Sequence, residues 1–210
     1  MKKHRYFFCA LLLCALTTVV TGAYSQNSFS ALSGVTTGNK IDHYKAETEG
    51  YFVCPVNTSK GIVLSNNFAS KLYLIDDENL VELVSAPGCG RYFTLSADRS
   101  AVGFKLIRQN GMQVPAIYDL NAMKVIELSA PVDLCGQVSF SNNGKIVYTV
   151  GNNLCVVQNG NVSQFPLGTY TNIAPVSPDG NFVIFNNDAD QLLMINLATG
   201  QITQITDNAQ

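Results

Sequence analysis

Hydrophobic and polar positions along the chain repeat four times in the same order. Each copy has a short apolar segment, a polar turn, a second apolar segment, a looser polar stretch, and two more apolar segments joined by a tight turn. In the last copy these features lie in order at 173–176, 177–180, 182–185, 192–195 and 202–205. No long stretch has the 3.6-residue period of an amphipathic helix. The pattern therefore predicts an all-β chain.

The turn between the first two apolar segments sets the period of the repeat. These turns begin at residues 57, 96, 141 and 177, so consecutive copies are 39, 45 and 36 residues apart. A period of this length suits one four-stranded antiparallel blade of a β-propeller per copy. The apolar segments are rich in side chains that favour strands, and the turns in Gly, Asn and Asp. We expect a propeller region at 51–210 with four blades, near 51–84, 92–128, 137–165 and 173–206.

The turn Ser177-Pro178-Asp179-Gly180 resembles the turn that joins the first two strands of each blade in the TolB-like family of propeller repeats, relatives of the WD repeat. The resemblance covers roughly residues 51–206, and Asn143 replaces the turn aspartate in the third copy. It implies a structural role for the matching turn residues Asp98, Asp179, Gly144 and Gly180. It also implies a periplasmic scaffold, or a binding domain attached to a hydrolase.

Four copies leave the closure of the ring open. Propeller rings have about four to eight blades, and the resemblance implies six or more. A complete four-bladed ring, part of a larger propeller and half-rings that pair all fit the sequence. We favour part of a larger propeller, whose next turn would begin near residue 213 by the same period. An incomplete ring would expose the edge of a blade, and we would expect it to self-associate.

The first 25 residues have the layout of a secretory signal peptide. The chain starts with the basic residues Lys2, Lys3 and Arg5. Residues 6–20 are nearly all apolar, and Ala23-Tyr24-Ser25 places small residues at alternate positions. The apolar run is shorter than the roughly 20 residues that a membrane-spanning helix needs. We therefore expect residues 1–25 to be removed, and the mature protein to be periplasmic or secreted without stable membrane insertion.

Alternatives to this cleavage are a membrane anchor and a lipoprotein with its lipid on Cys14. Leu13 argues against the lipoprotein, because a small residue normally precedes the lipid-bearing cysteine. Residues 26–50, which would follow the signal peptide, are expected to be irregular or to add one more strand.

The charge of the mature chain narrows the class of partner. Cleavage after Ser25 removes three basic residues and no acidic one, so 10 Lys and Arg face 15 Asp and Glu and the net charge is −5. An acidic chain without a Lys/Arg cluster is a poor binder of nucleic acid or of anionic membranes. We expect a protein or glycan partner and no nucleic acid.

Catalytic motifs are missing from the sequence. His43 is the only histidine after the signal peptide, so a Ser-His-Asp triad has a single candidate base. No Gly-x-Ser-x-Gly elbow, phosphate-binding loop or His-Glu-x-x-His motif occurs. Asp188 and Asp190 are a carboxylate pair, but their loop setting favours solvated acids. We expect no catalytic residue, no metal site and no cofactor.

Four cysteines follow the signal peptide, Cys54, Cys89, Cys135 and Cys155. In an oxidising compartment they permit two disulfides, and buried free thiols are an equal alternative. Cys89 and Cys135 each precede a glycine at the start of a repeat, where the innermost strand of a blade begins. They are candidates for a disulfide or thiol site at the central channel, or for small residues that fill a narrow axis.

Candidate partner contacts lie on the longer loops, because function concentrates on variable loops held by a rigid scaffold. These loops are 86–91, 108–115, 131–136, 166–172 and 186–191. Arg and Tyr side chains dominate binding hot spots, so Arg91, Arg108 and Tyr170 are the candidates. The alternative is that these three residues pack between blades.

Two functions fit these observations. The first is a non-catalytic, exported binding or scaffold module for a protein or a cell-envelope glycan. The second is the accessory propeller of a larger hydrolase, such as a prolyl-oligopeptidase-like peptidase or a glycan-active enzyme, whose catalytic domain is absent from this chain.

Overall fold

The computed structural model describes residues 52–76 and 79–207. The expected signal peptide, 1–25, and the N-terminal segment, 26–50, lie outside these described residues. All regular secondary structure within them is β-strand, so the all-β prediction is confirmed. No helix in this part of the chain is long and apolar enough to span a bilayer.

Three of the four sheets have four antiparallel strands, which lie side by side in their order along the chain. The first blade consists of β1 (Phe52–Asn57), β2 (Ile62–Asn66), β3 (Lys71–Asp76) and β4 (Asn79–Ser85). The second consists of β5 (Thr94–Leu95), β6 (Ala101–Ile107), β7 (Gln113–Asp119) and β8 (Lys124–Glu127). The third consists of β9 (Ser139–Phe140), β10 (Ile146–Val150), β11 (Asn153–Gln158) and β12 (Asn161–Pro166). These sheets confirm the prediction of four-stranded antiparallel blades.

The fourth blade differs from the prediction in its first strand. Its sheet consists of β13 (Phe182–Asn186), β14 (Leu192–Asn196) and β15 (Ile202–Gln204). The expected strand at 173–176 is reduced to one bridge, in which Val176 pairs with Val183. The carbonyl oxygen of Pro175 accepts a hydrogen bond of 3.1 Å from the N–H of Ile184. Because proline has no N–H, it cannot donate in return, and the ladder stops.

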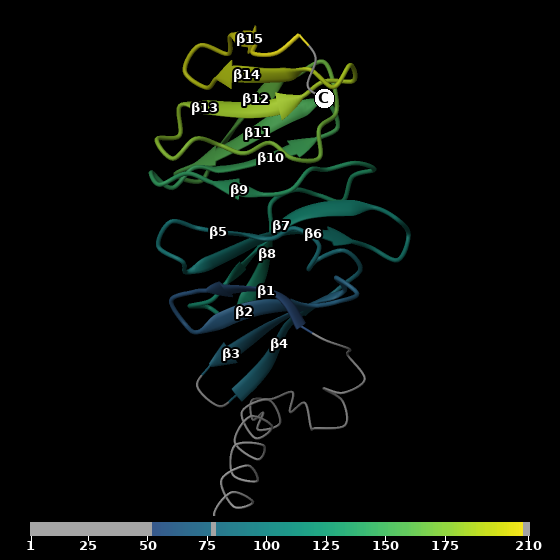
Figure 1. Ribbon diagram of the computed structural model, residues 1–210, viewed down its shortest axis with the longest axis vertical. Helices are drawn as coiled ribbons and strands as arrows, with labels where there is room; N and C mark the ends of the chain where they lie inside the picture. Colours follow the sequence, from purple (N-terminus) through teal and green to yellow (C-terminus); the bar gives the residue numbers. More distant parts are fainter. Residues whose placement is uncertain (1–51, 77–78, 208–210) are drawn as a thin grey trace, which may run out of the picture.

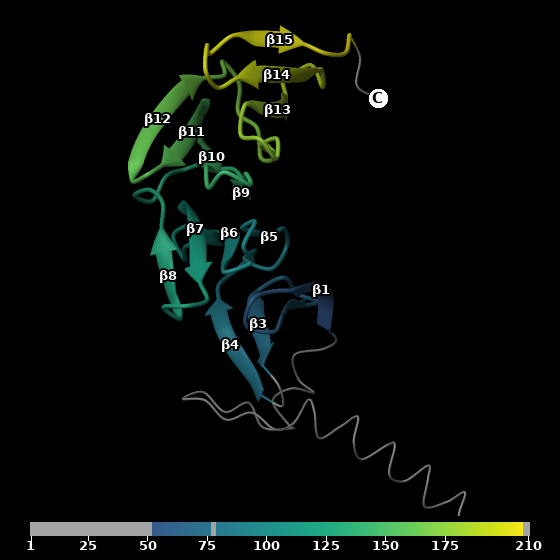
Figure 2. The ribbon, with the colours of Figure 1, turned by 90° about the vertical axis from the view of Figure 1, so that its left-hand side faces the viewer.

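The four sheets are stacked along the molecule in chain order (Figure 1). In Figure 2 the stack curves, with β4, β8 and β12 along its left side and β1, β5 and β9 along the right. Each of the first three blades therefore presents its first strand to the inside of the curve and its fourth strand to the outside (Figure 2). This arrangement brings the segments that lead into successive first strands close together.

Hydrophobic clusters fill the spaces between neighbouring blades. The cluster between the first two blades includes Leu72, Leu74, Phe104, Val114 and Ala116. The cluster between the second and third includes Ile117, Val138, Tyr148 and Cys155. The cluster between the third and fourth includes Val147, Leu154, Val183, Phe185 and Ile195. Each large side chain buried in this way stabilises the fold by about 1.5–3 kcal/mol, so packing between blades is the main source of stability.

Side chains of the second strands alternate between the two neighbouring blades, as a strand requires. Val63 packs toward the second blade and Val147 toward the fourth, and both are fully buried. The corresponding Ile184 of the fourth blade is 37% exposed. The far side of the fourth blade therefore exposes an apolar side chain at a position that the following blade buries in the first and third blades.

Candidate functional site

Loops and turns divide the molecule into two faces. The turn face carries the connections from first to second and from third to fourth strands, at 58–61, 96–100, 120–123, 141–145, 159–160, 177–181 and 197–201. The loop face carries the connections from second to third strands and between blades, at 67–70, 86–93, 108–112, 128–138, 151–152, 167–175 and 187–191. Because consecutive strands are antiparallel, these two sets of connections lie at opposite ends of the strands in every sheet.

The aspartates of the turn face hold their own turns together. Asp98 accepts hydrogen bonds of 2.7 Å from both the Ser96 and Ser100 hydroxyls, and Asp179 accepts one of 2.5 Å from the Ser177 hydroxyl. Hydrogen bonds from these serines are the main reason that the pKa of each carboxyl lies below its usual value. The carboxylates therefore work as local turn acceptors.

Turns of the third and fourth blades also contact each other. Gly144 and Gly180 have positive φ values, 82° and 70°. Asn143 accepts a bond from its own turn and donates one of 2.8 Å to the Asp179 carbonyl oxygen. A Cβ on Gly180 would lie 2.5 Å from the amide oxygen of Asn143, and the Lys145 ammonium donates to the Gly180 carbonyl at 2.7 Å. Asparagine in place of the turn aspartate thus links two blades.

On the loop face, Lys105 ties three blades together. Its ammonium leaves β6 and donates to the Cys135 carbonyl oxygen at 3.1 Å and to the Asn172 amide oxygen at 2.8 Å. The Tyr170 hydroxyl donates to the same two acceptors, at 3.1 and 3.3 Å. Cys135 leads into the third blade, and Asn172 leads into the fourth. These residues together with Arg91 are called the loop-face cluster.

The loop-face cluster is positively charged. Burial lowers the pKa of Lys105, and the charge of Arg91 lowers it further. Lys105 uses two of its three ammonium hydrogens in the bonds above, and the Arg91 side chain is exposed. Neither cation pairs with a carboxylate among the residues that the structure describes. The cluster can therefore accept an external anionic group.

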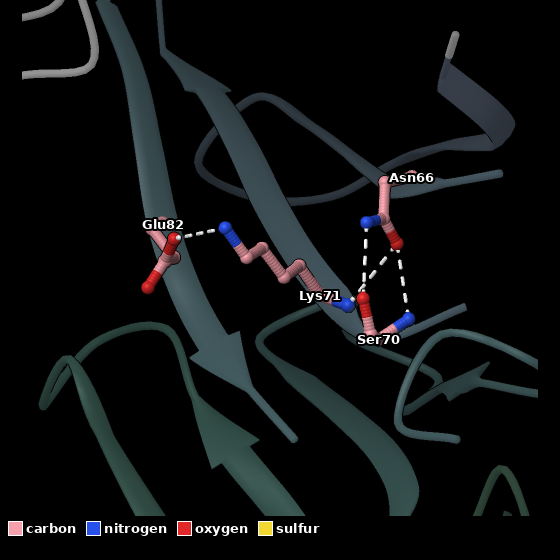
Figure 3. Close-up of polar contacts among 4 residues, drawn as sticks. All are labelled: Asn66, Ser70, Lys71 and Glu82. Atoms are coloured by element: carbon pink, nitrogen blue, oxygen red, sulfur yellow. Dashed lines mark hydrogen bonds and ion pairs between the residues drawn. The ribbon is translucent and has the colours of Figure 1, made fainter. Parts of the chain in front are cut away.

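Neighbouring loops of this face are held in shape by asparagine side chains. The Asn66 amide oxygen accepts from the N–H groups of Ser70 and Lys71, at 3.0 and 3.2 Å, and its NH₂ donates to the Ser70 hydroxyl (Figure 3). Lys71 also pairs with Glu82 at 3.4 Å. Asn187 acts in the same way in the fourth blade, accepting from two N–H groups at 3.0 and 2.9 Å. The loop face is thus pre-organised rather than shaped by a ligand.

The two cysteines singled out in the sequence are packing residues in this structure. Cys89 and Cys135 are free and fully buried, and burial raises the pKa of each thiol to about 11. At neutral pH they are protonated and unreactive. The glycines beside them are packed too: a Cβ on Gly90 would lie 1.9 Å from the Ser65 hydroxyl oxygen, and one on Gly136 would lie 2.3 Å from that of Thr149. Small residues are needed where the second and third blades begin.

Of the three partner-contact candidates, the structure brings two to Lys105. Tyr170 shares its acceptors and is half-buried, while Arg91 influences it electrostatically. Arg108 instead forms an ion pair with Glu127 of β8, away from the inner strands. Sequence reasoning missed Lys105 and Asn172. The available signal was that Lys105 is the only charged residue of β6, Ala-Val-Gly-Phe-Lys-Leu-Ile.

The acidic loop residues Asp188 and Asp190 have different surroundings. Asp188 accepts a hydrogen bond of 2.7 Å from the Thr169 hydroxyl, which braces the fourth blade's loop against the link before it. Asp190 is exposed, with φ 56°. Within 52–76 and 79–207, no group of three or more His, Cys, Asp or Glu side chains lies close enough to hold a metal ion.

Sequence comparisons leave the chain without a close relative, whereas structural comparisons are informative. No protein-family model matches the sequence. No curated protein matches it either. Many solved structures share its fold. Because their sequence identity is low, these likenesses bear on the fold alone.

Two TolB structures are among them. TolB from Acinetobacter baumannii is 16% identical with a TM-score of 0.55, over 74% of this chain and 43% of that one. A putative TolB from Agrobacterium tumefaciens is also 16% identical, with a TM-score of 0.58 over 76% of this chain and 63% of that one. The tricorn protease is 12% identical, with a TM-score of 0.55 over 76% of this chain and 17% of that one. The chain spans less than two thirds of each of these proteins. In its fold, the described part of this chain is a run of consecutive blades of a TolB-like β-propeller.

Proposed function

We propose that this chain is an exported, non-catalytic binding module that holds an acidic segment of a protein partner at the loop-face cluster. The observation that carries the proposal is that Lys105, held between the lead-in segments of two blades, and the nearby Arg91 both lack a carboxylate partner in the described residues. They lie where the lead-in segments of successive blades meet, on a mildly acidic protein.

The chemistry of the cluster favours a carboxylate. The third hydrogen of the Lys105 ammonium and the guanidinium of Arg91 are donors that suit an Asp, Glu or C-terminal carboxylate. Tyr170 supplies a half-buried ring beside them, and Tyr and Arg are common in binding hot spots. Because Lys105 is already fixed by two hydrogen bonds, little side-chain freedom is lost on binding.

Export is part of the proposal and rests on the sequence. The basic start, the short apolar run and Ala23-Tyr24-Ser25 together favour a cleaved signal peptide. N-terminal sequencing of the exported protein is expected to begin at or near Gln26. A mature protein that retains residues 11–13 would contradict cleavage.

The absence of catalysis is likewise a proposal. The described thiols with a resolved pKa shift are more basic than usual, which disfavours a cysteine nucleophile. We expect no peptidase or esterase turnover from the chain on general peptide and ester substrates. Turnover that a single substitution in this chain abolishes would overturn this part of the proposal.

Selection from a random peptide display library tests the partner class. We expect the selected peptides to be enriched in Asp and Glu, and their affinity to fall as salt is raised. Arg91→Ala should weaken binding about tenfold, the size expected for loss of one charge-assisted contact of about 1.4 kcal/mol. Selection of neutral or basic peptides, or binding indifferent to Arg91→Ala and Tyr170→Ala, would contradict the proposal.

A second candidate function is the accessory propeller of a larger hydrolase. It is favoured by the match between these blades and part of the tricorn protease. Sequencing the gene beyond codon 210 distinguishes the two functions. A following catalytic domain would favour the hydrolase, whereas a stop codon or further blades alone would favour the binding module.

A further inference from the structure

A hollow of about 300 Å³ lies on the turn face, between the outer strands of the third blade and the start of the fourth blade's last turn. It is lined by Lys145, Val156, Gln158, Asn159, Asn161, Ser163, Phe165 and Leu197. This volume is at the lower end of the ~300–1,000 Å³ typical of small-molecule sites. The hollow is on the opposite face from the loop-face cluster.

The hollow arises where the third blade departs from the repeat. In the first blade, Leu74 pairs with Val81, and both pack into the cluster shared with the second blade. The same register pairs Val156 with Ser163 in the third blade. In the second blade the corresponding partner is an isoleucine, Ile126. A serine therefore stands where the first and second blades place a branched apolar residue, and the fourth blade also has a polar residue there, Thr203. The space that an apolar side chain would fill beside Val156 is left open.

Polar side chains surround this space without hydrogen-bonding one another. The side chains of Gln158, Asn159, Asn161 and Ser163 have no hydrogen-bond partner among the residues that the structure describes. The turn that positions them is tight, with Asn159 at φ 52° and Gly160 at φ 79°. Amide and hydroxyl groups both donate and accept, so together they can pair with several hydroxyls of one ligand.

The hollow is close to neutral in charge. Its lining contains no Asp or Glu, and its one cation, Lys145, donates to the Gly180 carbonyl oxygen at 2.7 Å. An anionic or cationic ligand would find no compensating charge beyond that engaged ammonium. This feature separates the hollow from the loop-face cluster, where two cations lack carboxylate partners.

Apolar groups complete the lining. Val156 and Leu197 are 6% and 9% exposed, so they form the base of the hollow rather than its rim. The half-buried ring of Phe165 stands beside them, with a Cβ on Gly200 placed 3.6 Å from it. A ring face beside amide groups suits a ligand with one apolar face and a rim of hydroxyls, which is the shape of a sugar ring.

We propose that this hollow binds a neutral saccharide unit. The Gln158, Asn159, Asn161 and Ser163 side chains hydrogen-bond its hydroxyl or acetamido groups, and Phe165 packs against its C–H face. The site goes beyond the protein-binding function proposed above and stands on separate residues, so either proposal can fail without the other.

The probe is N,N′-diacetylchitobiose, titrated into the isotopically labelled chain while amide resonances are recorded. We expect saturable shifts of the side-chain NH₂ resonances of Gln158, Asn159 and Asn161. Ser163→Val restores the residue type of the first blade, fills the hollow, and should weaken binding at least tenfold while the fold is kept. The matched control is Gln164→Val, on the same strand but absent from the lining, which should bind as the unaltered chain does.

Four results would overturn the proposal. One is the absence of saturable shifts up to about 10 mM probe, which is about ten times the dissociation constant of a weak, ~1 mM complex. Another is equal binding by Ser163→Val and the unaltered chain. The third is the same shifts with glycerol, which would reveal only a general response to polyols. Equal weakening by Gln164→Val would also contradict it, because the effect would then not belong to the hollow.

Discussion

Lys105 and Lys145 make similar contacts on opposite faces of the molecule. Each is half-buried, and each donates from one blade to a backbone carbonyl oxygen of the next, Cys135 for Lys105 and Gly180 for Lys145. Their surroundings differ. Arg91 is near enough for its charge to lower the pKa of Lys105, whereas Lys145 lies among amides and a serine. The same contact, from a lysine ammonium to a carbonyl oxygen of the next blade, therefore occurs in a cationic cluster on the loop face and in a neutral hollow on the turn face.

The two faces also differ in how they are built. Apart from the bonds of Asn143 and Lys145 to the fourth blade, the turn face uses local bonds, such as those from Ser96 and Ser100 to Asp98, which close within a few residues. The loop face uses contacts between blades, such as Lys105 with Asn172. A change at Lys105 should consequently disturb several blades, and a change at Asp98 only its own turn.

The largest expected difference is between Gly136→Ala and Gly144→Ala. A Cβ on Gly136 would lie 2.3 Å from the Thr149 hydroxyl oxygen and 2.9 Å from the Thr171 carbonyl oxygen, so about 3 kcal/mol of stability should be lost. A Cβ on Gly144 meets nothing within 4 Å, and only its positive φ costs about 1 kcal/mol. Urea unfolding of both variants measures the difference. Equal losses, or a larger loss for Gly144→Ala, would contradict the comparison.

The second-largest effect is expected at alkaline pH, where the loop face should lose stability. The unfolded thiols of Cys89 and Cys135 ionise near pH 9, but burial holds the folded pKa values at about 11. The unfolded state then binds fewer protons in this window, so the free energy of unfolding falls as pH rises from about 9 through 11, by about 2 kcal/mol per thiol. Urea midpoints at pH 8, 9 and 10 test this. Cys89→Ala should flatten the slope, and an unchanged slope would contradict the assignment to Cys89.

The smallest expected effect is that of acid pH on the turn face. Hydrogen bonds from Ser96 and Ser100 lower the pKa of Asp98, so its stabilising effect is present above the unfolded pKa and is lost as pH falls through the folded one. Because Asp98 is exposed, the effect is about 0.5 kcal/mol after solvent screening. The difference in unfolding free energy between Asp98→Asn and the unaltered chain should vanish at low pH. A difference that persists below pH 3 would show that the carboxylate charge is not its cause.

The repeat pattern predicted the blades because strand alternation and turn residues are local properties. Ser177-Pro178-Asp179-Gly180 folds as the sequence suggested, whereas the strand before it is cut short by Pro175. Arg91 and Tyr170 of the loop-face cluster were predicted, but Lys105 and Asn172 were not, because Lys105 meets partners 30 and 67 residues away and those contacts depend on how blades pack. The hollow was hidden for a related reason: Ser163 is unusual only once its strand register shows that it replaces Val81.

Calorimetric titration of one selected acidic peptide into a matched pair of variants, Lys105→Met and Lys145→Met, tests the central claim most directly. Each variant keeps a long side chain and removes one ammonium group that bridges two blades. The account predicts at least tenfold weaker binding for Lys105→Met, about 1.4 kcal/mol, and unchanged binding for Lys145→Met. Equal affinity of both variants, or a loss confined to Lys145→Met, would show that the acidic partner does not bind at the loop-face cluster.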